Sequence, residues 1–241
     1  DLLYKLFGVN AELLIDHAWG WEPCTIAEVK QYKPASNSIG SGQVLHCPYE
    51  SEKAKLVVRE MVDLLALDLV DKGLVTDQIV LTVGYDIENL TDLKRSKAYR
   101  GPITVDSYGR KIPKHSHGTA NIGRQTSSAK LITEAVMELY DRIVNPSLLV
   151  RRLNMAANHV VPEKSLLNDL QIEQLELFTD YDELEKQREE ENAALEREKK
   201  MQQTMLAIKK KFGKNAILKG MNLQEGATAK DRNQQIGGHK A

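Results

Sequence analysis

The sequence predicts an α+β fold in which four strands form one sheet and two helices cover one of its faces. Three observations point to it: two amphipathic helical segments, four segments typical of strands, and their order along the chain, β-α-β-β-α-β. Two helices with one apolar stripe each are enough to cover one face of a four-stranded sheet, so the layout is ferredoxin-like. The opposite face stays open, and function is expected there.

The first strand is expected in SNSIGSGQVL, residues 36–45, which two glycines interrupt. The first helix is expected at residues 51–73, where apolar residues recur at helical spacing. Ser51 is its expected N-cap and Gly73 ends it. These two segments form the first strand-helix pair of the predicted order.

The second half repeats the pattern. QIVLTVGY, residues 78–85, shows strict strand alternation. A long loop at residues 86–116 separates it from a third strand at 117–126. The second helix is expected at 127–144, and LLVRRLNMAAN, residues 148–158, completes the sheet.

Segments of different character flank this domain. Residues 1–21 predict a helical element and residues 22–35 a tether with two prolines. The predicted domain spans 36–158, and the tail at 159–241 is expected to be largely helical or disordered. Within the tail, residues 181–211 predict a charged helix without a sustained apolar heptad, so coiled-coil pairing is not favoured.

Composition narrows the class of protein. The chain has 241 residues, 41% of them apolar, which suits a protein with a buried core. Cys24 and Cys47 are too few for a disulfide framework and lack the spacing of a zinc site. No apolar run is long enough to cross a membrane and no signal peptide is evident, so a cytoplasmic location without a membrane partner is expected.

Alternation in the third and fourth strands predicts what the open face carries. If Ala120 and Ile122 pack under the helices, then His117, Thr119 and Asn121 point outward. In the last strand, inward packing of the apolar residues points Arg152 and Asn154 out, and the first strand offers Ser38, Gly40 and Gly42. The result is a surface of hydroxyls, amides, small residues and arginine.

The charge of this region agrees. The net formal charge of the chain is only -1, but between Thr91 and Arg152 the basic residues outnumber the acidic ones. The basic residues are Lys94, Arg95, Lys97, Arg100, Arg110, Lys111, Lys114, Arg124, Lys130, Arg142, Arg151 and Arg152. Such donors suit phosphate oxygens, in contacts that are blind to base sequence. A basic segment that serves only solubility is the alternative; the lack of stacking aromatics favours a duplex over single-stranded RNA.

These segments, taken in order, resemble a known family. SNSIGSGQVL, the long helix, IVLTVGYDI, HGTANIGRQTSSAKLITEAVMELYDRI and LLVRRLNMAAN look like the little-finger domain of Y-family translesion DNA polymerases of the UmuC/DinB type. LLYKLFGVNAELLIDHAWGWE resembles the last helices of the thumb, which makes residues 1–21 a thumb remnant. The C-terminal segment is similar to the tails of bacterial members.

The resemblance implies a little-finger domain that grips the backbone of a primer-template duplex in translesion synthesis and DNA repair. It carries over to Ser36 and Ser38 in the first strand and to residues of the third and fourth strands. With Gly40, Lys114 and His117, which the residue pattern adds, the candidate DNA-binding set is Ser36, Ser38, Gly40, Lys114, His117, Thr119, Asn121, Arg124, Arg151 and Arg152. A location at the nucleoid follows.

The resemblance also implies what this segment lacks. Family members hold their metal-binding carboxylates in a palm domain, and nothing in the sequence matches it. Two-metal phosphoryl transfer needs carboxylates that hold ions about 3.5–4 Å apart. We therefore expect no catalytic residues, metal or cofactor in this segment, and magnesium in the missing palm of the intact polymerase.

QLELF, residues 174–178, resembles the short peptide with which bacterial polymerases bind the sliding clamp. Leu175, Leu177 and Phe178 would fill apolar pockets while Gln174 makes a polar anchor. The alternative is that these side chains fold back on the domain.

Two other functions stay open at this stage. The chain could be a stand-alone ferredoxin-like module that binds a protein or small ligand, without salt-dependent DNA binding. It could also be a nonspecific DNA-binding accessory protein that never had a palm.

Overall fold

The structure is a computed structural model that describes residues 1–22, 24–32, 37–106, 108–168, 181–236 and 239–240. It divides into two compact units, Asp1–Ser36 and Asn37–Ala241, which are described separately below.

The first unit contains three short helices, α1 (Leu2–Phe7), α2 (Asn10–Ala18) and α3 (Ile26–Gln31). Gly8 separates the first two with a φ of 56°, a value that glycine adopts without strain. The third helix lies in the segment expected to be a tether. A capping box starts it: Glu28 N donates to Thr25 Oγ1 at 3.3 Å, and Thr25 N donates back to the Glu28 carboxylate at 2.7 Å. TIAE carries this signal in the sequence.

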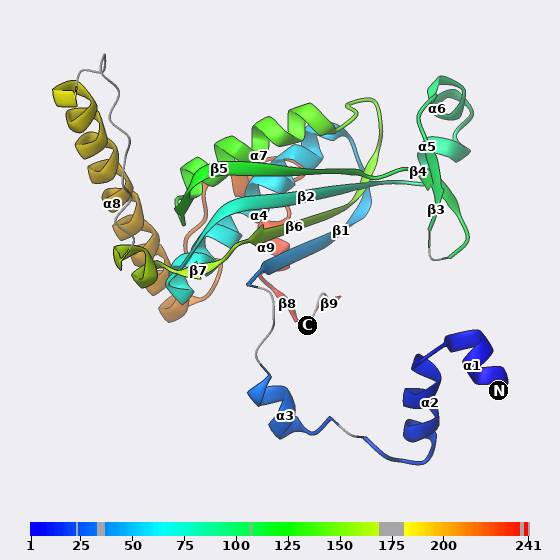
Figure 1. The fold of residues 1–241 in the computed structure, drawn as a ribbon. Helices are drawn as coiled ribbons and strands as arrows, with labels where there is room; N and C mark the ends of the chain where they lie inside the picture. Colours follow the sequence, from blue (N-terminus) through cyan, green and yellow to red (C-terminus); the bar gives the residue numbers. More distant parts are fainter. Residues whose placement is uncertain (23, 33–36, 107, 169–180, 237–238, 241) are drawn as a thin grey trace. The chain divides into compact units, whose positions relative to one another are not determined.

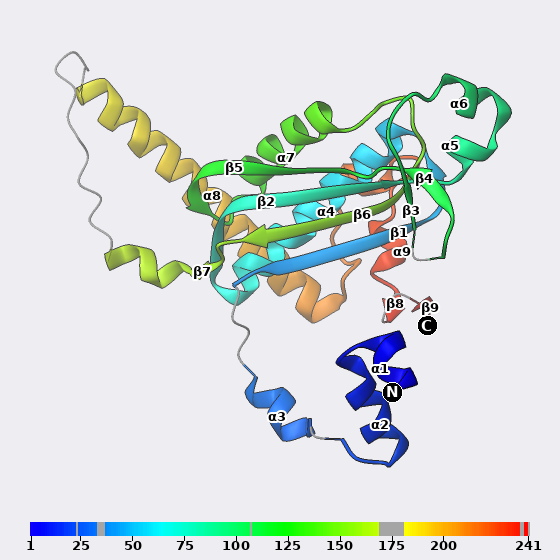
Figure 2. The same cartoon turned by 45° about the vertical axis from the view of Figure 1, so that its right-hand side comes forward.

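The second unit is built on an antiparallel sheet with the strand order β1-β6-β2-β5 (Figure 1). Its strands are β1 (Ile39–Tyr49), β6 (Val150–Asn158), β2 (Leu74–Tyr85) and β5 (Ser116–Thr126). The long helices α4 (Ser51–Lys72) and α7 (Ala129–Ile143) cover one face (Figure 2). The predicted fold class and order of elements are confirmed.

The core lies between these helices and the sheet. Ile79, Leu81 and Val83 of β2 are fully buried, as are Val57 and Val58 of α4. Gly73 ends α4 in the left-handed conformation with a φ of 64°. The expected N-cap of this helix was wrong by one residue, because Glu50 occupies that position and Ser51 is the first helical residue.

The connection between β2 and β5, expected to be a loop, is folded. It contains α5 (Glu88–Thr91), α6 (Leu93–Ala98) and the hairpin of β3 (Ile103–Val105) with β4 (Lys111–Pro113). Asn89 is fully buried at its base and exchanges hydrogen bonds with the backbone of Leu149. The buried Asn89 amide thus joins the connection to the residue that precedes β6.

The remaining elements follow β6. They are β7 (Val161–Pro162), which pairs with β2, the 3-10 helix η1 (Glu163–Asn168), the long helix α8 (Tyr181–Phe212), the 3-10 helix η2 (Gly220–Leu223), α9 (Ala229–Arg232), and the short pair β8 (Gln235–Ile236) and β9 (His239–Lys240). None of the described helices is both long enough and apolar enough to span a membrane.

Helix α8 packs against the start of α7. Ser128 Oγ donates to the Glu198 carboxylate at 2.5 Å, and Lys130 N donates to the same carboxylate at 3.0 Å. Gln202, only 5% exposed, donates to Ser127 O at 3.2 Å. A carboxylate at a helix N-terminus bonds amides that have no partner within the helix. The second half of α8 is therefore part of the folded domain.

The segment after α8 returns along the outer side of α4. There Glu60, 1% exposed, accepts hydrogen bonds from Thr228 N at 2.7 Å and Ala229 N at 3.1 Å. Asn222 Nδ2 donates to the other oxygen at 2.8 Å, and Lys219 forms an ion pair with Asp63. The segment binds to Glu60 and Asp63 on the outer side of α4. This helix is therefore covered by the sheet on one side and by the C-terminal segment on the other.

Candidate nucleic-acid interface

The open face of the sheet is the surface opposite α4 and α7, and its side chains follow from strand alternation. Where core residues of β2 point to the helices, Gln78, Val80, Thr82 and Gly84 point away. The register places Asn121, Thr119 and His117 of β5 directly beside the first three. On the other side, β6 contributes Asn158, Ala156, Asn154 and Arg152 opposite the same four positions, and β1 adds Gly40, Gly42 and Val44.

Three rows of side chains result; the first and third are polar, and in the second only Thr119 is polar, beside Val80 and Ala156. Gln78 links the first row, because its Nε2 donates to Asn121 Oδ1 at 3.0 Å and its Oε1 accepts from Asn158 Nδ2 at 3.1 Å. In the third row Thr82 Oγ1 and His117 Nδ1 are 2.8 Å apart. Arg152 begins the next row and is exposed. None of the side chains that form these rows is acidic.

The first strand brings small residues to the face. A Cβ added at Gly42 would lie 2.5 Å from Asn154 Oδ1, so the Asn154 side chain occupies the space that any larger residue would need. A hollow of about 330 Å³ lies here, lined by the glycines of β1 with Thr82 and Asn154. Small residues let a ligand's backbone approach the sheet closely.

Arg151 does not follow the alternation. Gly84 pairs with Arg152 and Tyr85 with Val150, so Arg151 is the extra residue of a bulge. Its Nε lies 3.7 Å from a carboxylate oxygen of Asp86, which is itself nearly buried. The two arginines were expected together in the DNA-binding set, but only Arg152 lies on the open face; Arg151 does not.

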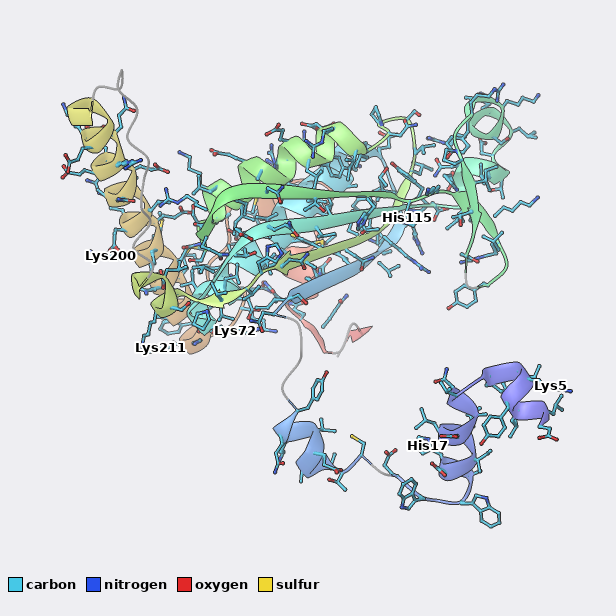
Figure 3. The ribbon with its side chains drawn as sticks, in the orientation of Figure 1. Lys5, His17, Lys72, His115, Lys200 and Lys211 are labelled. Atoms are coloured by element: carbon cyan, nitrogen blue, oxygen red, sulfur yellow. The ribbon has the colours of Figure 1, made fainter. Side chains whose placement is uncertain are left out.

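The other expected DNA-binding residues are placed as follows. Ser38 is exposed and precedes β1, and Ser36 lies outside the described residues. Lys114 is exposed between β4 and β5, beside His115 (Figure 3). Arg124, at the far end of β5, forms an ion pair with Glu191 of α8, with 2.9 Å between Nη1 and Oε1.

The basic residues of the β2–β5 connection divide into two groups. Lys94, Lys97 and Lys111 are exposed and bring positive charge beyond the end of the sheet. Arg110 is instead paired with Asp106 at 2.7 Å and lies over the Tyr108 ring, with 5.1 Å to the centroid. Hydrogen bonds from the Arg110 backbone and side chain lower the pKa of the Asp106 carboxyl below its usual value.

Sequence reasoning missed the contribution of the central strand. Gln78 and Thr82 of β2 and Asn158 of β6 stand in the polar rows but were not named as candidates. The signal was available, since both positions of β2 alternate with the buried Ile79, Leu81 and Val83. Only the pairing of β2 between β6 and β5 shows that these side chains occupy the middle of the face.

In the part of the chain that the structure describes, no group of three histidine, cysteine, aspartate or glutamate side chains could hold a metal ion. The peptide QLELF, residues 174–178, lies outside the described residues.

Comparisons with known proteins bear on residues 36–172, which match the model of the impB/mucB/samB family C-terminal domain. No curated protein matches the chain. Among solved structures, the chain is similar to a complex of the beta-clamp processivity factor and the little finger domain of PolIV, with a TM-score of 0.34 and 9% identity over 59% of this chain and 100% of that one. A post-insertion binary complex of Dbh DNA polymerase gives a TM-score of 0.29 and 12% identity over 67% of this chain and 38% of that one.

Proposed function

We propose that this chain is the part of a bacterial translesion polymerase that grips DNA and recruits the sliding clamp. The chain belongs to the impB/mucB/samB family of Y-family polymerases, because its residues 36–172 match the C-terminal domain of that family. The observation that carries the first half is the open face, on which the outward residues of β2, β5 and β6 include amides, hydroxyls and arginine but no acidic residue. Its site of action is the cytoplasm, at the nucleoid.

The chemistry of this face suits the sugar-phosphate backbone of a primer-template duplex. Phosphate oxygens accept hydrogen bonds from Asn, Gln, Thr and Arg side chains alike, and such contacts hold DNA without reading its bases. The rows span roughly 14 Å across the strands and 20 Å along them at ordinary sheet spacings. That area accommodates several consecutive phosphates of a DNA strand, in contacts that weaken with salt.

Binding of a fluorescent primer-template duplex, followed by anisotropy across a salt series, tests this half. Asn154→Asp adds a negative charge to the middle of the face while keeping the shape of the side chain, so the Kd should rise roughly tenfold at low salt. Gln203→Glu, which adds the same charge at an exposed position of α8, is the matched control and should change little. Wild-type protein that fails to bind the duplex at low salt would favour a protein- or ligand-binding module instead.

Clamp recruitment rests on QLELF. Two leucines and a phenylalanine offer a compact apolar anchor beside Gln174, in a segment otherwise rich in charge. A tethered peptide raises the local concentration of the polymerase at the clamp without fixing its orientation. Calorimetry against a bacterial clamp should show binding that the Leu177→Ala, Phe178→Ala double variant loses. Equal binding of both chains would exclude the peptide as the contact.

Polymerisation itself belongs to the intact enzyme in this proposal. The described residues hold no cluster of metal-ligating side chains, and we expect magnesium to act in a palm domain. Substitutions on the open face should therefore change how tightly DNA is held, and through that the processivity of the intact polymerase.

A further inference from the structure

A groove of about 770 Å³ runs along the outer edge of β1. One wall is β1 with the neighbouring Arg152 and Asn154, and the other is the C-terminal segment around α9 and β8. Figure 2 shows α9 and β8 next to β1. Segments nearly 190 positions apart in the chain thus form one surface.

Specific hydrogen bonds hold the second wall in place. Gln43 Nε2 donates to Thr228 Oγ1 at 2.8 Å, and Arg232 Nη1 donates to Gln43 Oε1 at 2.9 Å. The buried Glu60 carboxylate binds the amides of Thr228 and Ala229 from below. The position of Arg232 beside β1 is therefore fixed by both the strand and the helix beneath it.

The lining favours an anionic ligand that can accept several hydrogen bonds. Arg152 and Arg232 come from opposite walls, His46 and Gln235 add further polar groups, and Asp231 is the one carboxylate in the lining. Among the described strands β1 pairs only with β6, so the backbone groups of its outer edge face no other strand. Arginine together with backbone N–H and amide donors is the set that phosphate groups bind.

We propose that this groove binds phosphates of the DNA strand that lies on the open face, which makes the C-terminal segment part of the DNA interface. This proposal rests on the proposed function and extends its site. The groove and the open face share Gly42, Val44, Arg152 and Asn154, so a backbone that crosses the sheet continues into the groove without a break. That continuity favours a nucleic-acid strand over a separate peptide ligand.

Two substitutions of opposite sign test the proposal by duplex-binding anisotropy across a salt series. Arg232→Gln should raise the Kd about five- to tenfold at low salt and lower the salt slope by about one, as expected for one lost phosphate contact. Asp231→Asn removes the negative charge from the groove, so it should lower the Kd about two- to fivefold at low salt, with the effect fading at high salt. Lys200→Gln removes an exposed charge on α8 (Figure 3) and should change neither quantity by more than about one tenth of these effects.

Each outcome is decisive. Arg232→Lys should retain most of the affinity, because the charge remains, and melting curves show whether Arg232→Gln still folds. If that variant does not fold, the gain from Asp231→Asn decides, since a purely structural segment would give none. Wild-type binding with both variants unchanged would overturn the groove and leave the open face intact, whereas no wild-type binding would overturn the proposed function. If these substitutions changed the affinity for inorganic phosphate but not the affinity for DNA, the groove would be assigned to a free phosphate and the proposal would be refuted.

Discussion

Glu60 holds the C-terminal segment on the domain, and its removal should release that segment. The carboxylate is 1% exposed and accepts from Thr228 N, Ala229 N, Thr228 Oγ1 and Asn222 Nδ2 at 2.7, 3.1, 3.2 and 2.8 Å. Glu60→Ala leaves all four donors without their acceptor in a place that water reaches poorly. The segment can satisfy them only by moving away from α4.

The size of the effect follows from the two backbone bonds alone. Hydrogen bonds to a charged group contribute about 1.5–3 kcal/mol each, so the loss for Thr228 and Ala229 is about 3–6 kcal/mol. Since about 1.4 kcal/mol corresponds to a factor of ten, the local opening equilibrium should shift by about 10²- to 10⁴-fold. The core between α4 and the sheet keeps its contacts, so local opening should exceed any global loss.

Native-state hydrogen exchange measures this directly. Amides of residues 222–232 should lose protection in Glu60→Ala, while Leu81 and Leu153 in the central strands keep theirs. Glu60→Gln retains one carbonyl acceptor and should lose less, and Glu138→Ala on the exposed side of α7 serves as the control for removing a glutamate. Unchanged protection of Thr228 and Ala229 in Glu60→Ala would refute the role assigned to this carboxylate.

Three further predictions concern the domain itself. Gly118→Ala places a Cβ 2.8 Å from Leu139 Cδ1 and should cost about 1–3 kcal/mol in urea unfolding, whereas Gly40→Ala, with only Met155 O at 3.8 Å, should cost far less; equal losses would contradict the packing. Asn89→Ala removes both bonds to the Leu149 backbone and should cost about 2–5 kcal/mol, which thermal or urea melts would detect, and a loss under about 0.5 kcal/mol would exclude the anchor. Burial raises the pKa of Tyr140 to about 12, above the value near 10 of the unfolded chain. The contribution of Tyr140 to the free energy of unfolding is therefore complete below about pH 10 and is lost at about 1.4 kcal/mol per pH unit as the pH rises to 12. Tyr140→Phe should lack this part of the dependence of stability on pH, and the same dependence in both proteins would refute the prediction.

The fold class and the order of strands and helices could be predicted because the signals for them lie between residues close together in the sequence. A period of two in residues 78–85 and apolar stripes in two long helices each depend on neighbours within a few positions. Gly73 marked the end of α4 for the same reason, since a left-handed residue is required there. The outward direction of Asn154 and Arg152 follows from the burial of Leu153 and Met155 in the same strand.

What the sequence did not predict depends on pairs that are far apart in the chain. Glu60 and Thr228 are 168 positions apart, and neither residue alone indicates a contact. The bulge at Arg151 appears only when β6 is paired with β2, and Gln78 becomes central only in that pairing. The capping box of α3 is the exception, because TIAE is a local signal for a helix start within the segment predicted to be a tether.

The predicted clamp peptide lies in the sequence between two elements that contact each other, η1 and α8. QLELF lies between η1, which ends at Asn168, and α8, which begins at Tyr181. Both elements are tied to the same end of the sheet, since Lys199 of α8 pairs with Glu163 of η1 at 2.6 Å. Tyr181 precedes Lys199 by 18 helical positions (199 − 181 = 18), or about 27 Å at 1.5 Å per residue. In the proposed function, a clamp bound to residues 174–178 would therefore be held at a point of the chain between η1 and α8, the two elements that the Lys199–Glu163 ion pair joins.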